Sequence, residues 1–146
     1  MPDMDALYVA SATSWGGRSG RAASPDGALD VPIAVPKELG GEGGGTNPEQ
    51  LMAAGYACCF LNALILTAAK REIDPSEATV TAAVGLVTIS GGLGLAVELR
   101  IRFPGIEREM AEKLVERAHR VCPFSNATRG NVDLALTIEE PAPAAA

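Results

Sequence analysis

The hydrophobic pattern of the chain is dominated by one long apolar segment between residues 48 and 71. Apolar side chains occupy nearly every face of this segment at helical spacing, which is typical of a helix that is buried on most sides. Asn47 is a favourable N-cap residue, and Pro48 fits the first helical position because proline lacks a backbone N–H. The pattern therefore predicts a long buried central helix that begins at Pro48 and ends near Arg71.

Shorter segments on both sides of this helix have the alternation and β-branched composition of strands, and glycine or proline separates them. A second helix is expected where apolar residues recur at helical spacing among charged ones. The expected strands are residues 6–14, 18–24, 29–34, 79–90, 95–103 and 131–138, and the second helix is residues 107–121. Pro32 restricts its strand to a sheet edge or a strand end. This order predicts an α+β fold with antiparallel sheets, as one domain over residues 1–140 followed by a disordered tail at 141–146.

Composition and charge exclude several classes of function. Of the 146 residues, 47% are hydrophobic and 21% are charged, which is an ordinary globular balance. No apolar run is expected to reach the roughly 18 residues that cross a membrane, so a membrane protein is not expected. The net charge is −6, no basic stripe is present, and one Trp, two Tyr and three Phe are too few for a base-stacking surface. Nucleic acid is therefore a poor candidate partner.

The three cysteines and the single histidine are the candidate chemical groups. An odd number of cysteines excludes a complete disulfide framework, and no Cys-x₂-Cys spacing supports a metal site. Free thiols indicate a reducing compartment, so we expect a cytoplasmic protein that holds no metal and no bound cofactor. His119 lies among charged residues of the second helix and is expected to be exposed.

Cys58 and Cys59 lie in the middle of the long helix, and Cys122 follows the second helix. Adjacent helical residues point about 100° apart, so the first two thiols cannot easily bond to each other. One interpretation is that both are small core residues. The other is that one of them and Cys122 form a pair of an attacking and a resolving thiol. Burial raises the pKa of a thiol, so such a pair needs a nearby cation to stabilise the thiolate.

The candidates for this cation are Arg18, which follows two glycines, Arg21, three residues further on, and Arg129, which follows the Cys122 segment. Glu49, in the first turn of the long helix, is a candidate partner that orients Arg18 through a bidentate ion pair. Ten residues of helix, about 15 Å, separate Glu49 from Cys59, so Glu49 would act only through the arginine side chain or main-chain curvature. The alternatives are an exposed hairpin arginine and a glutamate that merely favours the helix dipole.

Three separated motifs, in order along the chain, resemble the organic hydroperoxide resistance (Ohr) proteins of the OsmC superfamily. The motifs are GGRSGR at 16–21, NPEQL with AGYACCF at 47–51 and 54–60, and VCPFSNATRGN at 121–131. The resemblance implies a thiol peroxidase that acts as an intertwined homodimer. It assigns Cys59 as the attacking thiol, Cys122 as the resolving thiol, Arg18 as the catalytic arginine and Glu49 as its partner. The chain departs from the commoner pattern at Cys58, where Ala or Ser is usual, and at Met52, where an aromatic is frequent.

The resemblance further implies that alkyl or fatty-acid hydroperoxides are reduced to alcohols through a sulfenic acid and a Cys59–Cys122 disulfide. A dithiol, such as a dihydrolipoyl group on a protein, is the expected reductant. Apolar residues near the thiol would favour organic over hydrogen peroxide, and the expected pocket residues are Leu51, Met52, Phe60 and Phe124. The competing interpretations are a thiol redox sensor and a dimer that binds an apolar ligand without turnover.

Overall fold

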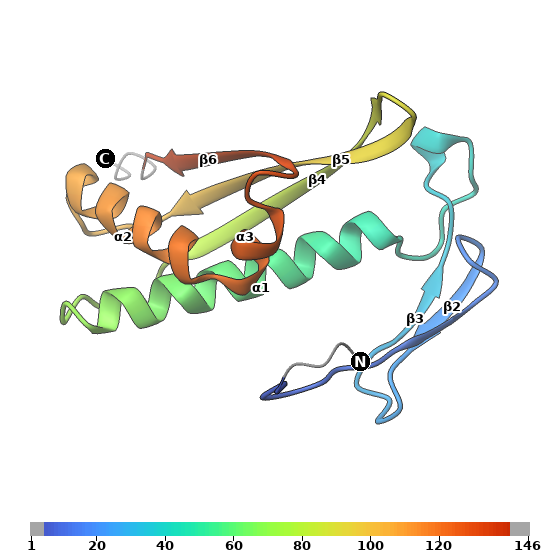
Figure 1. Ribbon diagram of the computed structural model, residues 1–146, viewed down its shortest axis with the longest axis horizontal. Coiled ribbons are helices and arrows are strands. Elements are labelled where there is room, and N and C mark those ends of the chain that lie inside the picture. The colour runs from blue at the N-terminus through green and yellow to red at the C-terminus, as the bar shows by residue number, and fades with distance from the viewer. Residues whose placement is uncertain (1–4, 141–146) are drawn as a thin grey trace, which may run out of the picture. The chain divides into compact units, whose positions relative to one another are not determined.

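The computed structural model describes residues 5–140, which form two compact units that divide between Leu51 and Met52. Two three-stranded sheets and three α-helices confirm the α+β class (Figure 1). The expectation of a single domain over residues 1–140 stays a prediction. The tail expected to be disordered, 141–146, lies outside the described residues.

The first unit is built around an antiparallel sheet with the strand order β1-β2-β3. Its strands are β1 Thr13–Trp15, β2 Gly20–Ala23 and β3 Asp30–Ile33, and a short 3₁₀ helix η1 (Lys37–Leu39) follows. Pro32 lies on the edge strand β3, as the sequence predicts, because proline cannot donate a ladder hydrogen bond. The strand expected over residues 6–14 is wrong for residues 6–12, because pairing with β2 begins only at Thr13.

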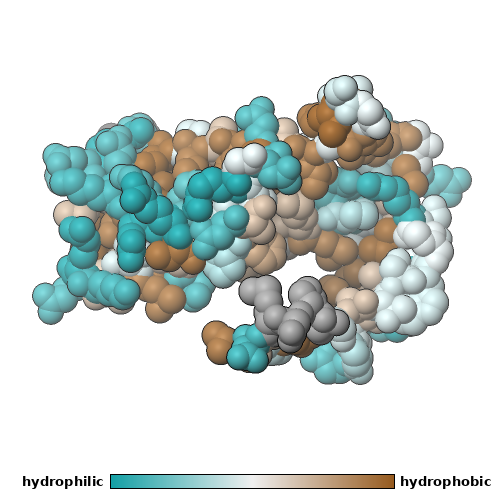
Figure 2. Space-filling model, in the orientation of Figure 1, coloured by the Kyte–Doolittle hydropathy of each residue, from teal (hydrophilic) through white to brown (hydrophobic). Residues whose placement is uncertain are grey.

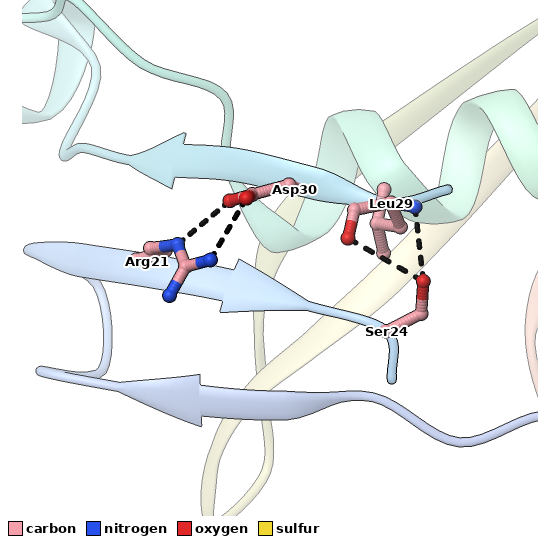
Figure 3. Close-up of polar contacts among 4 residues, drawn as sticks. All are labelled: Arg21, Ser24, Leu29 and Asp30. Atoms are coloured by element: carbon pink, nitrogen blue, oxygen red, sulfur yellow. Dashed lines mark hydrogen bonds and ion pairs between the residues drawn. The ribbon is translucent and has the colours of Figure 1, made fainter. Parts of the chain in front are cut away.

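Local side-chain contacts shape the two turns of this sheet. Arg21 on β2 donates two hydrogen bonds, of 2.6 and 2.8 Å, to the Asp30 carboxylate on β3 (Figure 3). The Ser24 hydroxyl accepts a 3.0 Å hydrogen bond from the Leu29 backbone N–H in the turn between them. Between β1 and β2, a Cβ at Gly20 would lie 1.8 Å from the Trp15 carbonyl oxygen, so only glycine fits there. The turn that carries Arg18 is therefore specified by nearby residues.

Helix α1 (Pro48–Ala69) begins at the predicted residue and ends two residues before the predicted Arg71. The Asn47 side chain accepts a 2.8 Å hydrogen bond from the Gln50 backbone N–H, which is the predicted N-cap interaction. By length and hydropathy alone α1 is long and apolar enough to cross a membrane, so the expectation that no segment reaches that length is wrong. The core helix of a soluble protein passes the same test, so this result is weak evidence for a membrane span.

The second unit contains a sheet with the strand order β4-β5-β6. The antiparallel hairpin of β4 (Thr79–Ile89) and β5 (Gly92–Arg102) is confirmed. Strand β6 (Asp133–Glu139) runs parallel to β5, so the expectation of wholly antiparallel sheets is wrong. The chain between β5 and β6 forms helices α2 (Arg108–Val121) and α3 (Pro123–Thr128), and such a helical crossover allows parallel pairing. The sequence did not predict α3.

The core of the second unit lies between α1, the sheet and α2. Its fully buried members are Tyr56, Phe60, Leu64 and Ala68 on α1, Leu99 and Ile101 on β5, and Leu114, Ala118 and Cys122 on or beside α2. Within a single chain, only one face of α1 is covered in this way. Ile65 and Leu66 on α1 keep 37% and 56% of their surface exposed. The expectation that α1 is buried on most sides is therefore met on one face only among residues 5–140.

Candidate active site

The structure brings Cys59 and Cys122 together, although 63 residues separate them in sequence. Cys59 lies on α1, where it packs against the core, and Cys122 lies between α2 and α3. The Cys122 backbone N–H bonds to the Ala118 carbonyl, and Pro123 starts α3, so the chain turns sharply at this cysteine. The two Sγ atoms are 3.6 Å apart, and both thiols are free. A disulfide requires them to approach by only about 1.5 Å more.

The surroundings of Cys59 favour the neutral thiol. Burial is the largest cause that raises the pKa of Cys59, and the neighbouring Cys122 and Cys58 raise it further. A hydrogen bond from the Phe124 backbone lowers the pKa in part. The net direction is upward, so rapid nucleophilic chemistry at neutral pH requires an added cation. The expectation that a nearby cation stabilises this thiolate stays a prediction.

Cys58 has a different environment from its neighbour. It is exposed, whereas Cys59 is half-buried and Cys122 is fully buried. Successive helical side chains point about 100° apart, so Cys58 faces away from the Cys59–Cys122 contact. Of the two adjacent cysteines, Cys59 is therefore the one placed to react with Cys122.

A buried polar contact beside the thiols was not predicted from the sequence. The Tyr56 hydroxyl lies 2.9 Å from Ser125 Oγ and 3.0 Å from Thr128 Oγ1. Tyr56 precedes Cys59 by three residues on α1, and Ser125 follows Cys122 by three residues on α3. The contact therefore joins the same two segments that hold the sulfurs. A tyrosine inside an otherwise apolar helix was the available signal, because a buried Tyr hydroxyl needs a polar partner.

The Tyr56 ring also packs on Phe124, with centroids 5.7 Å apart. A Cβ at Gly55 would lie 3.3 Å from the Phe124 ring, so glycine allows this ring to approach α1 closely. These contacts hold the first turn of α3 against α1. They fix the position of Cys122 relative to Cys59 from the α3 side of the turn.

Cys59 borders a cavity of about 380 Å³ between α1 and the α2–α3 junction. Its wall is formed by Cys59, Asn62, Ala63, Leu66, Thr67, Lys70, Arg117, Val121 and Pro123. The four residues predicted to form an apolar pocket do not line this cavity. Phe60 is fully buried in the core, Leu51 and Met52 are half-buried, and Phe124 is 40% exposed beside Tyr56. Their role at a substrate stays a prediction.

The first unit contains the predicted Arg18–Glu49 ion pair. Arg18 donates hydrogen bonds of 2.9 and 2.7 Å to the two oxygens of the Glu49 carboxylate. The Arg18 hydrogen bond holds the pKa of Glu49 below its usual value, and the carboxylate in turn raises the pKa of Arg18. The ion pair therefore favours the charged form of both groups, and the Glu49 carboxylate orients the Arg18 guanidinium. The action of this pair on Cys59 stays a prediction.

His119 differs from its expected exposed position. It is half-buried on α2, and its Nδ1 atom is buried without a hydrogen-bond partner among the described residues. Burial, and then the charge of Arg129, lower the pKa of His119. A half-buried histidine with a lowered pKa replaces the solvated side chain that the charged sequence context suggested. Within residues 5–140, no three His, Cys, Asp or Glu residues are grouped as metal ligands.

Comparison with known proteins connects this geometry to one family. Residues 41–137 match the family described as OsmC-like protein. The organic hydroperoxide resistance protein of Xanthomonas axonopodis pv. citri is 54% identical over 134 residues, which cover 90% of this chain and 94% of that protein. The organic hydroperoxide resistance protein OhrB of Bacillus subtilis is 42% identical over 136 residues, covering 92% and 99%. A crystal structure of an organic hydroperoxide resistance protein from Elizabethkingia anophelis has a TM-score of 0.88 and 47% identity, covering 94% of this chain and 100% of that one.

Proposed function

Because the chain belongs to the family of OsmC-like proteins, we propose that it acts in organic hydroperoxide resistance as a thiol peroxidase that converts organic hydroperoxides to alcohols. The observation that carries this proposal is the 3.6 Å separation of two free thiols, one of which borders an apolar cavity. Such a pair supports a cycle of oxidation and disulfide formation.

In the first step, the Cys59 thiolate attacks the terminal oxygen of the hydroperoxide. A sulfur–oxygen bond forms, the oxygen–oxygen bond breaks, and the alkoxide leaves and takes up a proton to become the alcohol. The sulfur is oxidised to a sulfenic acid while the peroxide is reduced. In the second step, the Cys122 sulfur attacks Cys59, a disulfide forms, and water leaves. The short distance between the two sulfurs supports this second step.

Arg18 is the proposed cation for the first step. A guanidinium stabilises the Cys59 thiolate and the negative charge that develops on the peroxide oxygens. The bidentate contact with Glu49 supports this role, because it keeps the guanidinium charged and oriented. Glu49 is a positioning residue, since it would act through Arg18.

A dithiol completes the cycle by thiol–disulfide exchange. One of its sulfurs attacks the Cys59–Cys122 disulfide and the other displaces the mixed disulfide, which leaves the protein reduced and the dithiol as a cyclic disulfide. A dihydrolipoyl group, on a lipoylated protein or as a small molecule, is the proposed reductant. The free thiols fit a reducing compartment, so we assign the protein to the cytoplasm within the same proposal.

A homodimer is the proposed assembly. Large apolar side chains remain exposed in both units, including Trp15 at 52% and Leu66 at 56%. In the view of Figure 2, hydrophobic residues reach the surface among hydrophilic ones. Exposed apolar surface of this kind is typical of an interface, and a second copy would cover the free face of α1. Light scattering at micromolar concentration is expected to give a dimer mass. A monomer there would contradict this assembly.

The decisive experiment is a peroxide-consumption assay with tert-butyl hydroperoxide and dihydrolipoamide. We expect turnover in the wild type, loss of turnover in Cys59→Ser and retention in the matched control Cys58→Ser. If Cys59→Ser retains turnover and Cys58→Ser loses it, the attacking thiol is Cys58 and the assignment to Cys59 is wrong. Absence of turnover in the fully reduced wild type would contradict the proposed peroxidase function. It would favour a redox sensor or a protein that binds an apolar ligand.

Substrate preference is tested in the same assay. The apolar lining near Cys59 is expected to bind the carbon chain of an organic hydroperoxide, at about 0.8 kcal/mol for each buried methylene. The value of kcat/KM should therefore be higher for tert-butyl and linoleic hydroperoxide than for hydrogen peroxide. Comparable values for all three would refute the preference.

A further inference from the structure

Arg18 lies in the tight turn that joins β1 to β2. The Ser19 backbone N–H donates a 3.0 Å hydrogen bond to the Gly16 carbonyl across this turn, and Gly16 and Gly17 have positive φ angles of 76° and 57°. Gly17, Arg18 and Ser19 are all exposed, and a Cβ at Gly17 would meet nothing within 4 Å. The tip of the turn is therefore weakly packed, and its orientation depends on the two strand ends that carry it.

The strand ends at the base of this turn are Trp15 and Arg21, which pair directly across β1 and β2. The Arg21 guanidinium lies 5.4 Å from the centroid of the Trp15 ring, which is within the range of a cation–π contact. Its Nε and Nη2 atoms also donate the hydrogen bonds of 2.6 and 2.8 Å to the Asp30 carboxylate on β3 (Figure 3). These three residues form the Trp15–Arg21–Asp30 cluster, in which one side chain joins all three strands at the base of the Arg18 turn.

The backbone pairing of β2 with β3 is weak at this point of the sheet. Arg21 is paired with Pro32, which has no N–H to donate across the sheet. The Pro32 carbonyl accepts a 2.9 Å hydrogen bond from the Thr46 N–H, and Thr46 bridges β3 on its other side. The two hydrogen bonds from Arg21 to Asp30 therefore supply a link between β2 and β3 that the backbone does not make at this residue.

The geometry of the cluster suits a positioning role better than a role in stability. The side chains of Arg21 and Asp30 keep 54% and 49% of their surface exposed, and an ion pair at that exposure adds little to the free energy of unfolding. A planar guanidinium that binds a carboxylate through two nitrogens and also stacks on a ring has a defined orientation, which lysine cannot reproduce. The cluster therefore restricts the base of the turn mainly in direction.

We propose that Arg21 is a positioning residue, which sets the location of the Arg18 guanidinium through the Trp15–Arg21–Asp30 cluster. The proposal rests on the peroxidase function proposed above, in which Arg18 stabilises the Cys59 thiolate and the reacting peroxide. Arg21 acts through Arg18 and needs no contact with the peroxide. Glu49 orients the guanidinium directly, whereas the cluster orients the turn from which the Arg18 side chain extends.

A double-mutant cycle with Arg18 tests this coupling, with tert-butyl hydroperoxide and dihydrolipoamide as substrates. Arg21→Met should lower kcat/KM for the hydroperoxide by about threefold to tenfold, because it removes the ion pair and the cation–π contact together. The value of kcat/KM for dihydrolipoamide, which reports reduction of the disulfide, should stay within about twofold of the wild type. In the Arg18→Ala background, Arg21→Met should have no further effect. An equal fall in both backgrounds would overturn the proposal.

The same cycle can be measured without turnover where Arg18→Ala is too slow to assay. The pH midpoint of Cys59 alkylation is determined by mass spectrometry in a Cys58→Ser background, so that the exposed neighbouring thiol does not compete. Arg21→Met should raise this midpoint when Arg18 is present, because a displaced cation stabilises the thiolate less. The same rise in the Arg18→Ala background would contradict a role through Arg18.

Variants of the two ion-pair partners separate positioning from a general loss of charge pairs. Asp30→Asn leaves Arg21 in place and should lower kcat/KM for the hydroperoxide by about threefold, whereas Asp30→Glu keeps the carboxylate and should retain most of the wild-type value. Arg108→Met is the matched control, because Arg108 forms a similarly exposed pair with Glu112 in the second unit. An equal fall in Arg108→Met would refute the proposal.

Hydrogen exchange of the backbone amides tests the cluster independently of the proposed function. Arg21→Met should speed exchange in residues 16–20 by about threefold or more and leave exchange in α1 unchanged. Unchanged exchange in residues 16–20 would overturn the positioning role. Faster exchange there, in a protein whose wild type consumes no peroxide, would support the role of the cluster in holding the Arg18 turn and would contradict the peroxidase function instead.

Discussion

Replacement of Tyr56 by phenylalanine tests the buried contact that joins α1 to α3. Tyr56 is fully buried, and its hydroxyl contacts both Ser125 Oγ and Thr128 Oγ1. Phenylalanine keeps the ring that packs on Phe124 but removes the oxygen. Thr128 keeps hydrogen bonds to the carbonyls of Phe124 and Ser125, whereas Ser125 Oγ has no other partner among residues 5–140. The substitution therefore leaves one buried hydroxyl unpaired.

The expected magnitude follows from that unpaired group. A buried polar group without a partner costs about 1–3 kcal/mol, so Tyr56→Phe should lower the free energy of unfolding by about 2 kcal/mol. For a chain of this length, that loss corresponds to a Tm lower by roughly 4–8 °C. Adding Ser125→Ala removes the unpaired hydroxyl, so the double variant should lose about 1 kcal/mol less than the sum of the two single variants.

Urea titrations of the reduced protein, all at the same protein concentration, measure these differences in the free energy of unfolding. Tyr8→Phe is the matched control, because Tyr8 is 83% exposed and its hydroxyl loss should change the free energy of unfolding by less than about 0.5 kcal/mol. The reasoning fails if the free energy of unfolding of Tyr56→Phe is within about 0.5 kcal/mol of the wild-type value. It also fails if the Tyr56 and Ser125 substitutions are additive.

Three further predictions concern the thiols and the first unit. Cys122→Ser should still consume one equivalent of hydroperoxide but accumulate a Cys59 sulfenic acid, detected by mass spectrometry after trapping with a dione; absence of the trapped product would contradict the order of steps. Because burial raises the pKa of Cys59, its alkylation rate should rise with pH, and Arg18→Ala should move the midpoint upward by about one pH unit or more; an unchanged midpoint in the folded variant would exclude Arg18 as the stabilising cation. Gly20→Ala forces a Cβ within 1.8 Å of the Trp15 carbonyl oxygen, whereas a Cβ at Gly85 meets nothing closer than 3.8 Å. Gly20→Ala should therefore lower the free energy of unfolding by about 3 kcal/mol or more, and Gly85→Ala should lower it far less. Denaturant unfolding monitored by Trp15 fluorescence measures both values. Equal losses in the two variants would show that the close approach at Gly20 is unimportant.

Local patterns in the sequence determined much of the secondary structure. Asn47 and Pro48 mark the start of α1 because the cap and the first helical position depend only on neighbouring residues. The β4–β5 hairpin and the amphipathic α2 follow from alternation, turn residues and helical spacing. The motifs that contain Cys59 and Cys122 also indicated the family before any distance between them was known.

Only the tertiary structure decided how these elements meet. Periodicity shows which face of a helix or strand is apolar, but not which distant face covers it. The parallel direction of β6, the 3.6 Å contact of Cys59 with Cys122 and the hydroxyl contact of Tyr56 all join segments far apart in the chain. For the same reason His119 became half-buried in spite of its charged neighbours, and Phe60 became a core residue rather than a cavity wall. Side-chain packing between α1, the sheet and the α2–α3 turn settles these positions, because burial of apolar surface depends on the partner surface as much as on the residue.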